Sequence, residues 1–278
     1  MTVVSADSRN TVSEIRSRST LAAVDATKDF GGVRALKSVS IAVAEGEICG
    51  LIGPNGSGKT TLLNCLTGFI HPTTGTVTLD GEDITHRHPA QIARRRVART
   101  FQNIRLFDRL TVLQNIEVNA LAAGGLRRDA SLSTARQLAE EFGLQGLLES
   151  YAADLSYGDR RRVEIARCLG SAPRFLLLDE PTAGMNADET AALGELIQQI
   201  RRQRNCGVLL VDHDLELITL HCDSITVLNE GSRIAQGDSA AIQSNQAVVT
   251  AYIGESLEQA MGERHSRPNP NPRPMEDT

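Results

Sequence analysis

A glycine-rich segment in the first quarter of the chain has the residue types and spacing of a phosphate-binding loop. Residues 53–60 read Gly-Pro-Asn-Gly-Ser-Gly-Lys-Thr, which fits the pattern G-x-x-x-x-G-K-[ST]. Glycine allows backbone angles at which successive N–H groups converge on a phosphate, and a following helix points its positive end there. Lys59 would bind the β and γ phosphates, and Thr60 would give its hydroxyl to Mg²⁺. The nucleotide-binding residues predicted in this loop are Asn55, Gly56, Ser57, Gly58, Lys59, Thr60 and Thr61.

Two adjacent carboxylates, Asp179 and Glu180, follow an apolar stretch that is typical of a buried strand. Open α/β sheets bind ligands at the carboxyl ends of their strands. Asp179 suits Mg²⁺ coordination through water, and Glu180 is placed to polarise the attacking water. Gln102 would reach the metal or that water, and His213 would hydrogen-bond the γ-phosphate. Taken alone, a glutamine or a histidine at these places is also compatible with a purely structural role.

The segment 155–159, Leu-Ser-Tyr-Gly-Asp, precedes a helical pattern and admits two interpretations. In the first, Ser156 caps the helix, because S-x-x-[DE] is typical of a capping box. In the second, Ser156 and Gly158 belong to an anion site, which would offset three consecutive arginines in a first turn whose dipole disfavours cations. Pairing of Arg160 with Glu164 at i,i+4 would explain the arginines without an anion. Both interpretations can hold together.

Composition and charge limit the function classes. The chain has 278 residues, 41% apolar and 23% charged, as in soluble globular proteins. Its net charge of −5 argues against nucleic acid as the main partner. Five scattered cysteines without a C-x-x-C pair favour buried thiols over disulfides or a metal site. No run approaches the roughly 18 apolar residues that cross a bilayer, so membrane contact is expected through partner proteins.

Strand and helix patterns alternate in an order that indicates a largely parallel sheet with helices on both faces. Strands are expected at 21–27, 39–43, 48–52, 77–79, 97–101, 175–179 and 207–211, a hairpin at 224–236, and helices at 59–67, 188–204 and 214–221. Residues 103–154 have helical periodicity instead. The predicted organisation is a flexible arm at 1–20, one domain at 21–256 with a helical subdomain at about 103–170, and a disordered proline-rich tail at 257–278.

Together, these motifs resemble the ATP-binding cassette family in order and spacing over about residues 21–255. The resemblance implies an α/β fold: a RecA-like P-loop NTPase core with an antiparallel β portion and an inserted helical subdomain. It implies ATP and Mg²⁺ as cofactors, with Gln102, Asp179 and Thr60 at the metal. Phe30 would stack on adenine, although a lone phenylalanine is more often part of a core.

The resemblance also implies a head-to-tail dimer, either a homodimer or a heterodimer with a second ATPase of the family. In such a dimer Ser156 and Gly158 would face the γ-phosphate held by the other chain, and residues 183–186 would cross the interface. Asp159, Asn186 and Asp212 stand where glutamine, aspartate and glutamate are usual in the family.

Further segments look like the ATP subunit of branched-chain (hydrophobic) amino-acid importers, in which a tyrosine such as Tyr157 is normal. These segments are 64–69, 99–102, 157–158 with 161–168, and 252–254. The resemblance implies an ATP-hydrolysing subunit at the cytoplasmic face of a bacterial inner membrane. Its partners would be two transmembrane permease subunits and an extracytoplasmic solute-binding protein, with no nucleic acid.

Other functions remain open from the sequence. The lipopolysaccharide-export ATPase shares the Arg-Arg-Arg-Val-Glu-Ile-Ala-Arg helix, and urea or amide uptake is a further transport alternative. A non-transport protein of the family would need two cassettes or a long coiled-coil insert, and a regulator without hydrolysis would not need Glu180. A basic stretch beside Gln102 either docks a membrane subunit or forms a solvated face; it comprises Arg94, Arg95, Arg96, Arg99, Arg105 and Arg109.

Overall fold

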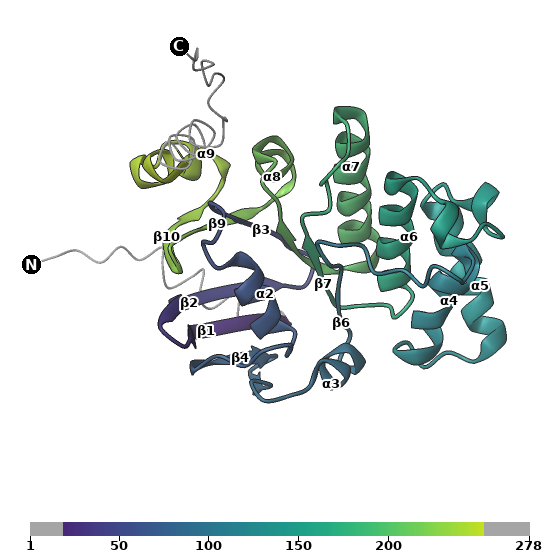
Figure 1. Ribbon diagram of the computed structural model, residues 1–278, viewed down its shortest axis with the longest axis horizontal. Coiled ribbons are helices and arrows are strands. Elements are labelled where there is room, and N and C mark those ends of the chain that lie inside the picture. Colours follow the sequence, from purple (N-terminus) through teal and green to yellow (C-terminus); the bar gives the residue numbers. More distant parts are fainter. Residues whose placement is uncertain (1–18, 253–278) are drawn as a thin grey trace, which may run out of the picture.

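The computed structural model describes residues 19–252. All but the last two residues of the predicted arm at 1–20, and the whole predicted tail at 257–278, therefore lie outside the described residues. A six-stranded sheet runs in the order β10-β9-β3-β8-β7-β6, and a four-stranded sheet runs in the order β2-β1-β4-β5 (Figure 1). The two sheets pack against each other, because residues of both belong to the same one of two buried apolar clusters.

The six-stranded sheet positions the candidate site. Neighbouring strands from β9 through β3, β8 and β7 to β6 pair in parallel, whereas β9 and β10 form an antiparallel hairpin. The three central strands are buried at every residue, as expected for parallel strands covered on both faces. The strands are β3 Ile48–Ile52, β6 Val97–Arg99, β7 Phe175–Asp179, β8 Gly207–Val211, β9 Ser224–Asn229 and β10 Ser232–Gly237.

Alternate side chains of each central strand enter two separate cores. In β7, Leu176 and Leu178 pack with helices α7 and α8, whereas Phe175 and Leu177 pack with α2 and the four-stranded sheet. Figure 1 shows the same layers, with α7 and α8 on one side of the sheet and α2 on the other. These helices are α2 Lys59–Leu66, α7 Ala187–Arg204 and α8 Leu215–His221.

The four-stranded sheet is antiparallel throughout. Its strands are β1 Thr20–Phe30, β2 Val33–Ala44, β4 Thr74–Leu79 and β5 Glu82–Asp83. Gly31, at φ 58°, makes the tight turn from β1 to β2. Two further short helices are α3 Pro89–Arg94 before β6, which adds Ile92 to this core, and α9 Ser239–Gln243 after β10, whose Ile242 belongs to the core on the other side of the six-stranded sheet.

Residues 103–170 form a helical region between β6 and β7 (Figure 1). It contains α4 Val112–Ala122, α5 Arg128–Glu141 and α6 Tyr157–Leu169, with two short 3₁₀ turns at Gln145–Leu147 and Ala152–Asp154. Thr111 begins α4 with a reciprocal capping box to Gln114. The buried Asn115 side chain ties the preceding loop to α4 through the N–H and carbonyl of Phe107, at 2.9 and 3.1 Å.

The element predictions are confirmed apart from their ends. The strand predicted at 97–101 stops at Arg99, because the backbone of Phe101 bonds to side chains of α6 and not to a neighbouring strand. Four cysteine thiols are buried as predicted, and that of Cys222 is half-buried. Among residues 19–252, no helix is both long and apolar enough to span a membrane.

Candidate functional site

The predicted phosphate loop joins β3 to α2 and has the backbone that its glycines allow. Gly53, Gly56 and Gly58 have φ values of 150°, 76° and 105°. A β-carbon on Gly58 would lie 2.6 Å from the Ala35 carbonyl oxygen, and one on Gly53 would lie 2.1 Å from that of Leu228. At Gly56 no atom would lie within 4 Å, so the loop is open at that point. Gly53 and Gly58 therefore allow close packing against neighbouring backbone, whereas Gly56 lies on an open part of the loop.

The start of α2 offers donors that suit a phosphate chain. Its N-cap is Gly58, which provides no side-chain cap, and the first turn contains no acidic residue. The buried hydroxyl of Ser57 has no hydrogen-bond partner among residues 19–252. The buried ammonium of Lys59 donates to the carbonyls of Gly53 and Pro54, at 2.6 and 3.0 Å. A helix N-terminus, a spare hydroxyl and an ammonium group on one loop fit a nucleoside triphosphate.

The parallel sheet brings the predicted carboxylates to the same edge as this loop, because β8 lies between β3 and β7. Asp179 is the last residue of β7 and is 2% exposed. Glu180 follows in the left-handed region, at φ 47°, and its N–H donates to the Val211 carbonyl at 2.7 Å. That conformation is uncommon for a residue with a side chain, and such strain is frequent at functional sites.

The structure brings Gln102 and Glu180 together. The amide nitrogen of Gln102 donates to the Glu180 carboxylate at 2.9 Å, although 78 positions separate the two residues. Gln102 is exposed, on the loop after β6, while Glu180 is half-buried. The predicted catalytic carboxylate is thus already oriented by the predicted glutamine.

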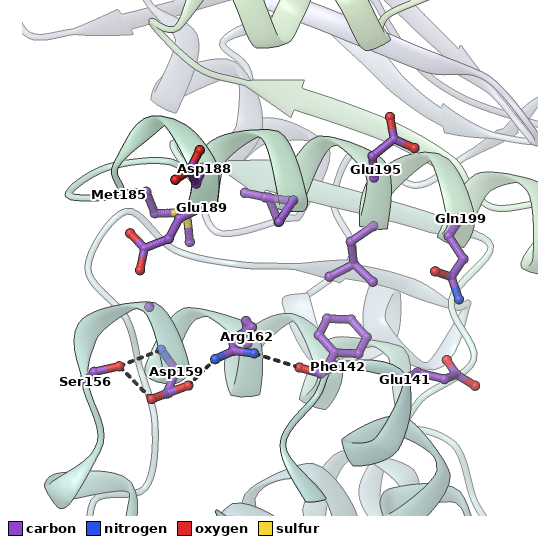
Figure 2. A pocket seen from close by; sticks show the side chains of 14 residues that line it. Glu141, Phe142, Ser156, Asp159, Arg162, Met185, Asp188, Glu189, Glu195 and Gln199 are labelled. Carbon is purple, nitrogen blue, oxygen red and sulfur yellow. Dashed lines mark hydrogen bonds and ion pairs between the residues drawn. The ribbon is translucent and has the colours of Figure 1, made fainter.

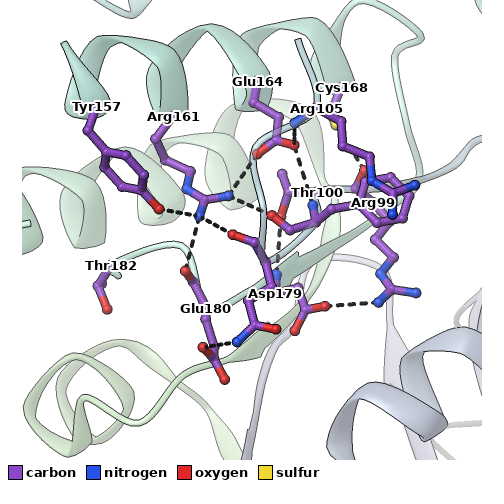
Figure 3. Close-up of polar contacts among 12 residues, drawn as sticks. Arg99, Thr100, Arg105, Tyr157, Arg161, Glu164, Cys168, Asp179, Glu180 and Thr182 are labelled. Carbon is purple, nitrogen blue, oxygen red and sulfur yellow. Dashed lines mark hydrogen bonds and ion pairs between the residues drawn. The ribbon is translucent and has the colours of Figure 1, made fainter. Parts of the chain in front are cut away.

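Asp179 forms a buried ion pair that the sequence did not predict (Figure 3). The Arg99 guanidinium lies 2.9 Å from the Asp179 carboxylate, and the two side chains are 5% and 3% exposed. Arg99 also donates to Asn64 at 2.7 Å and to Thr67 at 3.2 Å. Burial lowers the pKa of the Arg99 guanidinium, and the contact with Asp179 offsets only part of that effect. Arg99 is therefore a site residue, and its buried side chain fits neither of the two alternatives given for the basic stretch, a docking surface or a solvated face.

The predicted metal ligands form an oxygen-rich set that suits Mg²⁺. The Thr60 hydroxyl stands at the start of α2, and the Asp179 carboxylate stands at the end of β7 on the same sheet edge. The side-chain nitrogen of Gln102 donates to Glu180, which leaves the side-chain oxygen of Gln102 to bind a ligand. These residues fit a magnesium–nucleotide complex, and their role as ligands remains a prediction.

His213 and Asp212 lie after β8, beside the loop that follows Glu180. The His213 side chain is 70% exposed, whereas that of Asp212 is fully buried. The Asp212 carboxylate accepts from the Thr182 hydroxyl at 2.7 Å and from the N–H groups of His213 and Asp214 at 2.8 and 3.0 Å. Asp212 thus fixes the two loops that carry Glu180 and His213 relative to each other.

Ser156 caps α6, as predicted, by accepting from the Asp159 N–H at 3.2 Å. Its hydroxyl also donates to the Asp159 carboxylate at 2.6 Å, and Asp159 pairs with Arg162, which reaches the Phe142 carbonyl (Figure 2). Asp159 thus fills a structural role at a position where the family usually has glutamine.

The predicted pairing of Arg160 with Glu164 is wrong. Arg160 instead reaches the Asp108 carboxylate at 2.8 Å, and Arg161 pairs with Glu164 at 2.7 Å. Glu164 is fully buried on the helix face that Arg161 also occupies, so Arg161 and not Arg160 is its partner. An i,i+3 pair forms there because Arg160 points toward the surface loop before α4.

Ser156 lies at one end of a cleft of about 620 Å³ between α6 and α7 (Figure 2), and Gly158 also lines this cleft. Asn186, at the N-cap of α7, exchanges two hydrogen bonds with Glu189 at 2.9 and 3.0 Å. Asparagine caps helices as well as aspartate does, so this departure from the family pattern preserves the helix start. Glu189 also lines the cleft beside Gly158.

Phe30 lies at the end of β1 and is 47% exposed. The Lys28 ammonium stands 5.1 Å from the centre of its ring. A half-exposed aromatic ring excludes the core role considered above, because a core phenylalanine would be covered. Stacking on adenine remains a prediction.

The structure adds Arg99, Arg161, Glu164 and Asp212 to the predicted site. The sequence did contain a signal for Arg161 and Glu164. These two charged residues stand in a helical stretch among apolar residues at 163, 165, 166, 168 and 169, all of which are buried in the structure. A charge within an apolar helical stretch commonly has a buried partner. For Arg99 no local pattern indicates burial, because its partner is 80 residues away.

Comparison with known proteins gives a consistent result. Residues 36–183 match the model of the family described as ABC transporter. The chain is 43% identical over 241 residues to the high-affinity branched-chain amino acid transport ATP-binding protein LivG of Salmonella typhimurium, covering 82% of this chain and 94% of that protein. It is 41% identical over 244 residues to BraF of Pseudomonas aeruginosa, which has the same description, with 83% and 96% covered.

A lower identity, 35% over 238 residues, relates the chain to the lipopolysaccharide export system ATP-binding protein LptB of Escherichia coli, covering 86% of this chain and 98% of that protein. Among solved structures, a nucleotide-free ATP-binding cassette from an ABC transporter superposes with a TM-score of 0.77 at 30% identity, covering 85% of this chain and 100% of that one. A dimeric post-hydrolysis cassette bound to ADP and Pi gives a TM-score of 0.72 at 26% identity, with 79% and 98% covered.

Proposed function

The chain belongs to the ATP-binding cassette transporter family, and from that premise we propose that it energises the import of branched-chain or other hydrophobic amino acids. Its ATPase class and its P-loop fold follow from the family. The amino-acid substrate rests on the relatives: 43% and 41% identity to two branched-chain amino acid transport proteins, against 35% to the lipopolysaccharide export protein.

In the proposed reaction, the loop at 53–60 and Lys59 hold the phosphates of ATP, and Thr60 and Asp179 hold Mg²⁺, which would neutralise the developing phosphate charge. Glu180 polarises the attacking water, with Gln102 holding the carboxylate at 2.9 Å. His213, whose side chain is 70% exposed, would hydrogen-bond the γ-phosphate. The observation that carries the proposal is the convergence of these groups at one sheet edge.

The site is proposed to be complete only in a dimer. Ser156 and Gly158 lie at the start of α6, in the helical region, whereas the phosphate loop precedes α2, and we infer that they serve the nucleotide of a second copy or a related ATPase. A solved relative at 26% identity is described as dimeric with ADP and Pi. Two transmembrane permease subunits, an extracytoplasmic solute-binding protein and a location at the cytoplasmic membrane face complete the proposal.

Glu180→Gln tests the catalytic part. Turnover should fall about 100-fold or more because the general base is lost, while ATP affinity stays within about twofold and an ATP-dependent dimer accumulates in gel filtration. Glu149→Gln is the matched control, since Glu149 is an exposed carboxylate in the helical region. Normal turnover by the Glu180→Gln protein would remove Glu180 from the assigned role.

A deletion strain tests the substrate. Loss of the gene should reduce uptake of radiolabelled leucine, and the unchanged gene should restore it while the Lys59→Ala form should not. Lipopolysaccharide at the cell surface should stay normal. The export alternative, favoured by the 35% identity to LptB, would be supported by normal leucine uptake together with a lipopolysaccharide defect.

A further inference from the structure

Two fully buried charged residues in the described part of the chain form a network that the proposed reaction does not use. Arg161 and Glu164, both on α6, have fully buried side chains 2.7 Å apart (Figure 3). Such a pair is costly to desolvate, and apolar residues of similar size often fill the same space with no loss of stability. A contribution to folding stability therefore does not by itself explain why the chain contains this buried pair, whereas the hydrogen bonds of the pair indicate a further role.

Arg161 bonds to backbone groups of both catalytic loops. One terminal nitrogen donates to the Phe101 carbonyl at 2.9 Å, and the other donates to the carbonyls of Gln102 at 3.1 Å and Glu180 at 3.4 Å. The side chains of Gln102 and Glu180 meet at 2.9 Å. The guanidinium thus holds the backbones of the two residues whose side chains form the proposed water-polarising pair.

The same network fixes the loop after β6 and the first turn of α6. Glu164 accepts from the N–H groups of Phe101 at 3.4 Å and Arg105 at 3.3 Å. Arg161 also reaches the Tyr157 hydroxyl at 3.2 Å, and Tyr157 is the residue next to Ser156. A guanidinium presents five N–H donors from three nitrogens in a fixed planar fork, whereas an ammonium group has three rotatable donors on one nitrogen.

We propose that Arg161, oriented by Glu164, is a positioning residue that holds the Gln102–Glu180 pair in register with the start of α6. The inference rests on the proposed function, because the start of α6 is the element assigned to the nucleotide of the second copy. A shift of the first turn of α6 would then move the Glu180 carboxylate. Hydrolysis thereby depends on the placement of Ser156, although Ser156 itself does not touch Glu180.

The double variant Arg161→Met/Glu164→Met tests this, because it removes both charges and keeps their volume. It should bind ATP within about twofold of the unchanged protein and form the ATP-dependent dimer, yet its kcat should fall about tenfold or more. Arg161→Lys keeps the charge opposite Glu164 but loses the fork, and it should lower kcat in the same direction. The control Arg174→Met/Glu45→Met breaks a pair at the opposite end of β7 and should leave kcat unchanged.

An unchanged kcat in the folded double variant overturns the inference. If that variant does not fold, Arg161→Lys decides: a tenfold fall in kcat at unchanged ATP affinity supports positioning, and a normal kcat refutes it. Failure of the proposed function has a different readout, which is a Glu180→Gln protein that binds ATP without forming a dimer. A kcat that falls only in step with ATP affinity also counts against positioning, since it would mean a general loss of structure.

Discussion

Replacing Arg99 by methionine tests the buried ion pair with Asp179. The substitution keeps most of the side-chain length and removes the positive charge, leaving a carboxylate that is 3% exposed without its cation 2.9 Å away. Two further hydrogen bonds, to Asn64 and Thr67, are also lost. The asparagine and threonine can turn to other partners more easily than a buried carboxylate can.

Breaking a buried ion pair by removing one partner costs about 3–5 kcal/mol of unfolding free energy. In a domain of this size each kcal/mol lowers the thermal midpoint by about 2–4 °C, so the midpoint should fall by about 6–20 °C. Removing the second charge should recover part of this loss. The Arg99→Met/Asp179→Asn protein should therefore be more stable than the sum of the single changes indicates, with a coupling of about 0.5–3 kcal/mol.

Urea denaturation followed by circular dichroism, without nucleotide, measures all four proteins of this cycle. The matched control is the exposed pair of Arg34 with Asp29, whose removal should leave the urea midpoint unchanged. Magnesium–ATP should then stabilise Arg99→Met more than the unchanged chain, because the metal would replace the lost charge beside Asp179. Additive effects of the two single substitutions would refute the ion pair as described.

Three further predictions concern separate parts of the chain. Asp212→Ala should lower the thermal midpoint by about 6–12 °C, since it removes an acceptor of at least four hydrogen bonds and costs about 3 kcal/mol. Gly58→Ala should weaken ATP binding measured by titration calorimetry, whereas Gly32→Ala, where a β-carbon meets no atom within 4 Å, should not. Burial raises the pKa of three thiols to about 12, so iodoacetamide at pH 8 should label them far faster in the unfolded chain than in the native one. Because the folded pKa is the higher one, the stability that these thiols contribute is complete below about pH 9, the ordinary thiol value, and is lost as pH rises toward 12. The thiols are Cys168, Cys206 and Cys222.

The features predicted from sequence are those that neighbouring residues specify. The phosphate loop is a local pattern, because glycine conformation and the start of a helix depend on a few adjacent positions. Ser156 as a helix cap is local in the same way. The parallel direction of β7 and β8 follows from strand and helix alternation, so the shared edge of Asp179 and His213 was also predictable, although the order of the strands in the sheet was not.

The charges that the structure adds were not predictable in this way, because their environment depends on distant segments. Arg94 and Arg96 are exposed, whereas Arg99, a few residues further, is buried, and all three are arginines in one basic stretch. Composition therefore gives the same expectation for each of them. What separates Arg99 is its place at the end of β6, which pairs with β7 and so puts the guanidinium beside the last residue of that strand.

The burial of Arg161, like that of Arg99, depends on segments that are distant in the sequence. Its neighbours Arg160 and Arg162 bind surface carboxylates, and only the middle arginine of the three faces the sheet edge. A helix turns 100° per residue, so three consecutive identical residues must point in three directions. The direction that meets Glu164 and the two catalytic loops is set by how α6 packs on the six-stranded sheet. A run of like charges is thus better divided by helical face before it is assigned to solvent, to a ligand or to a docking partner.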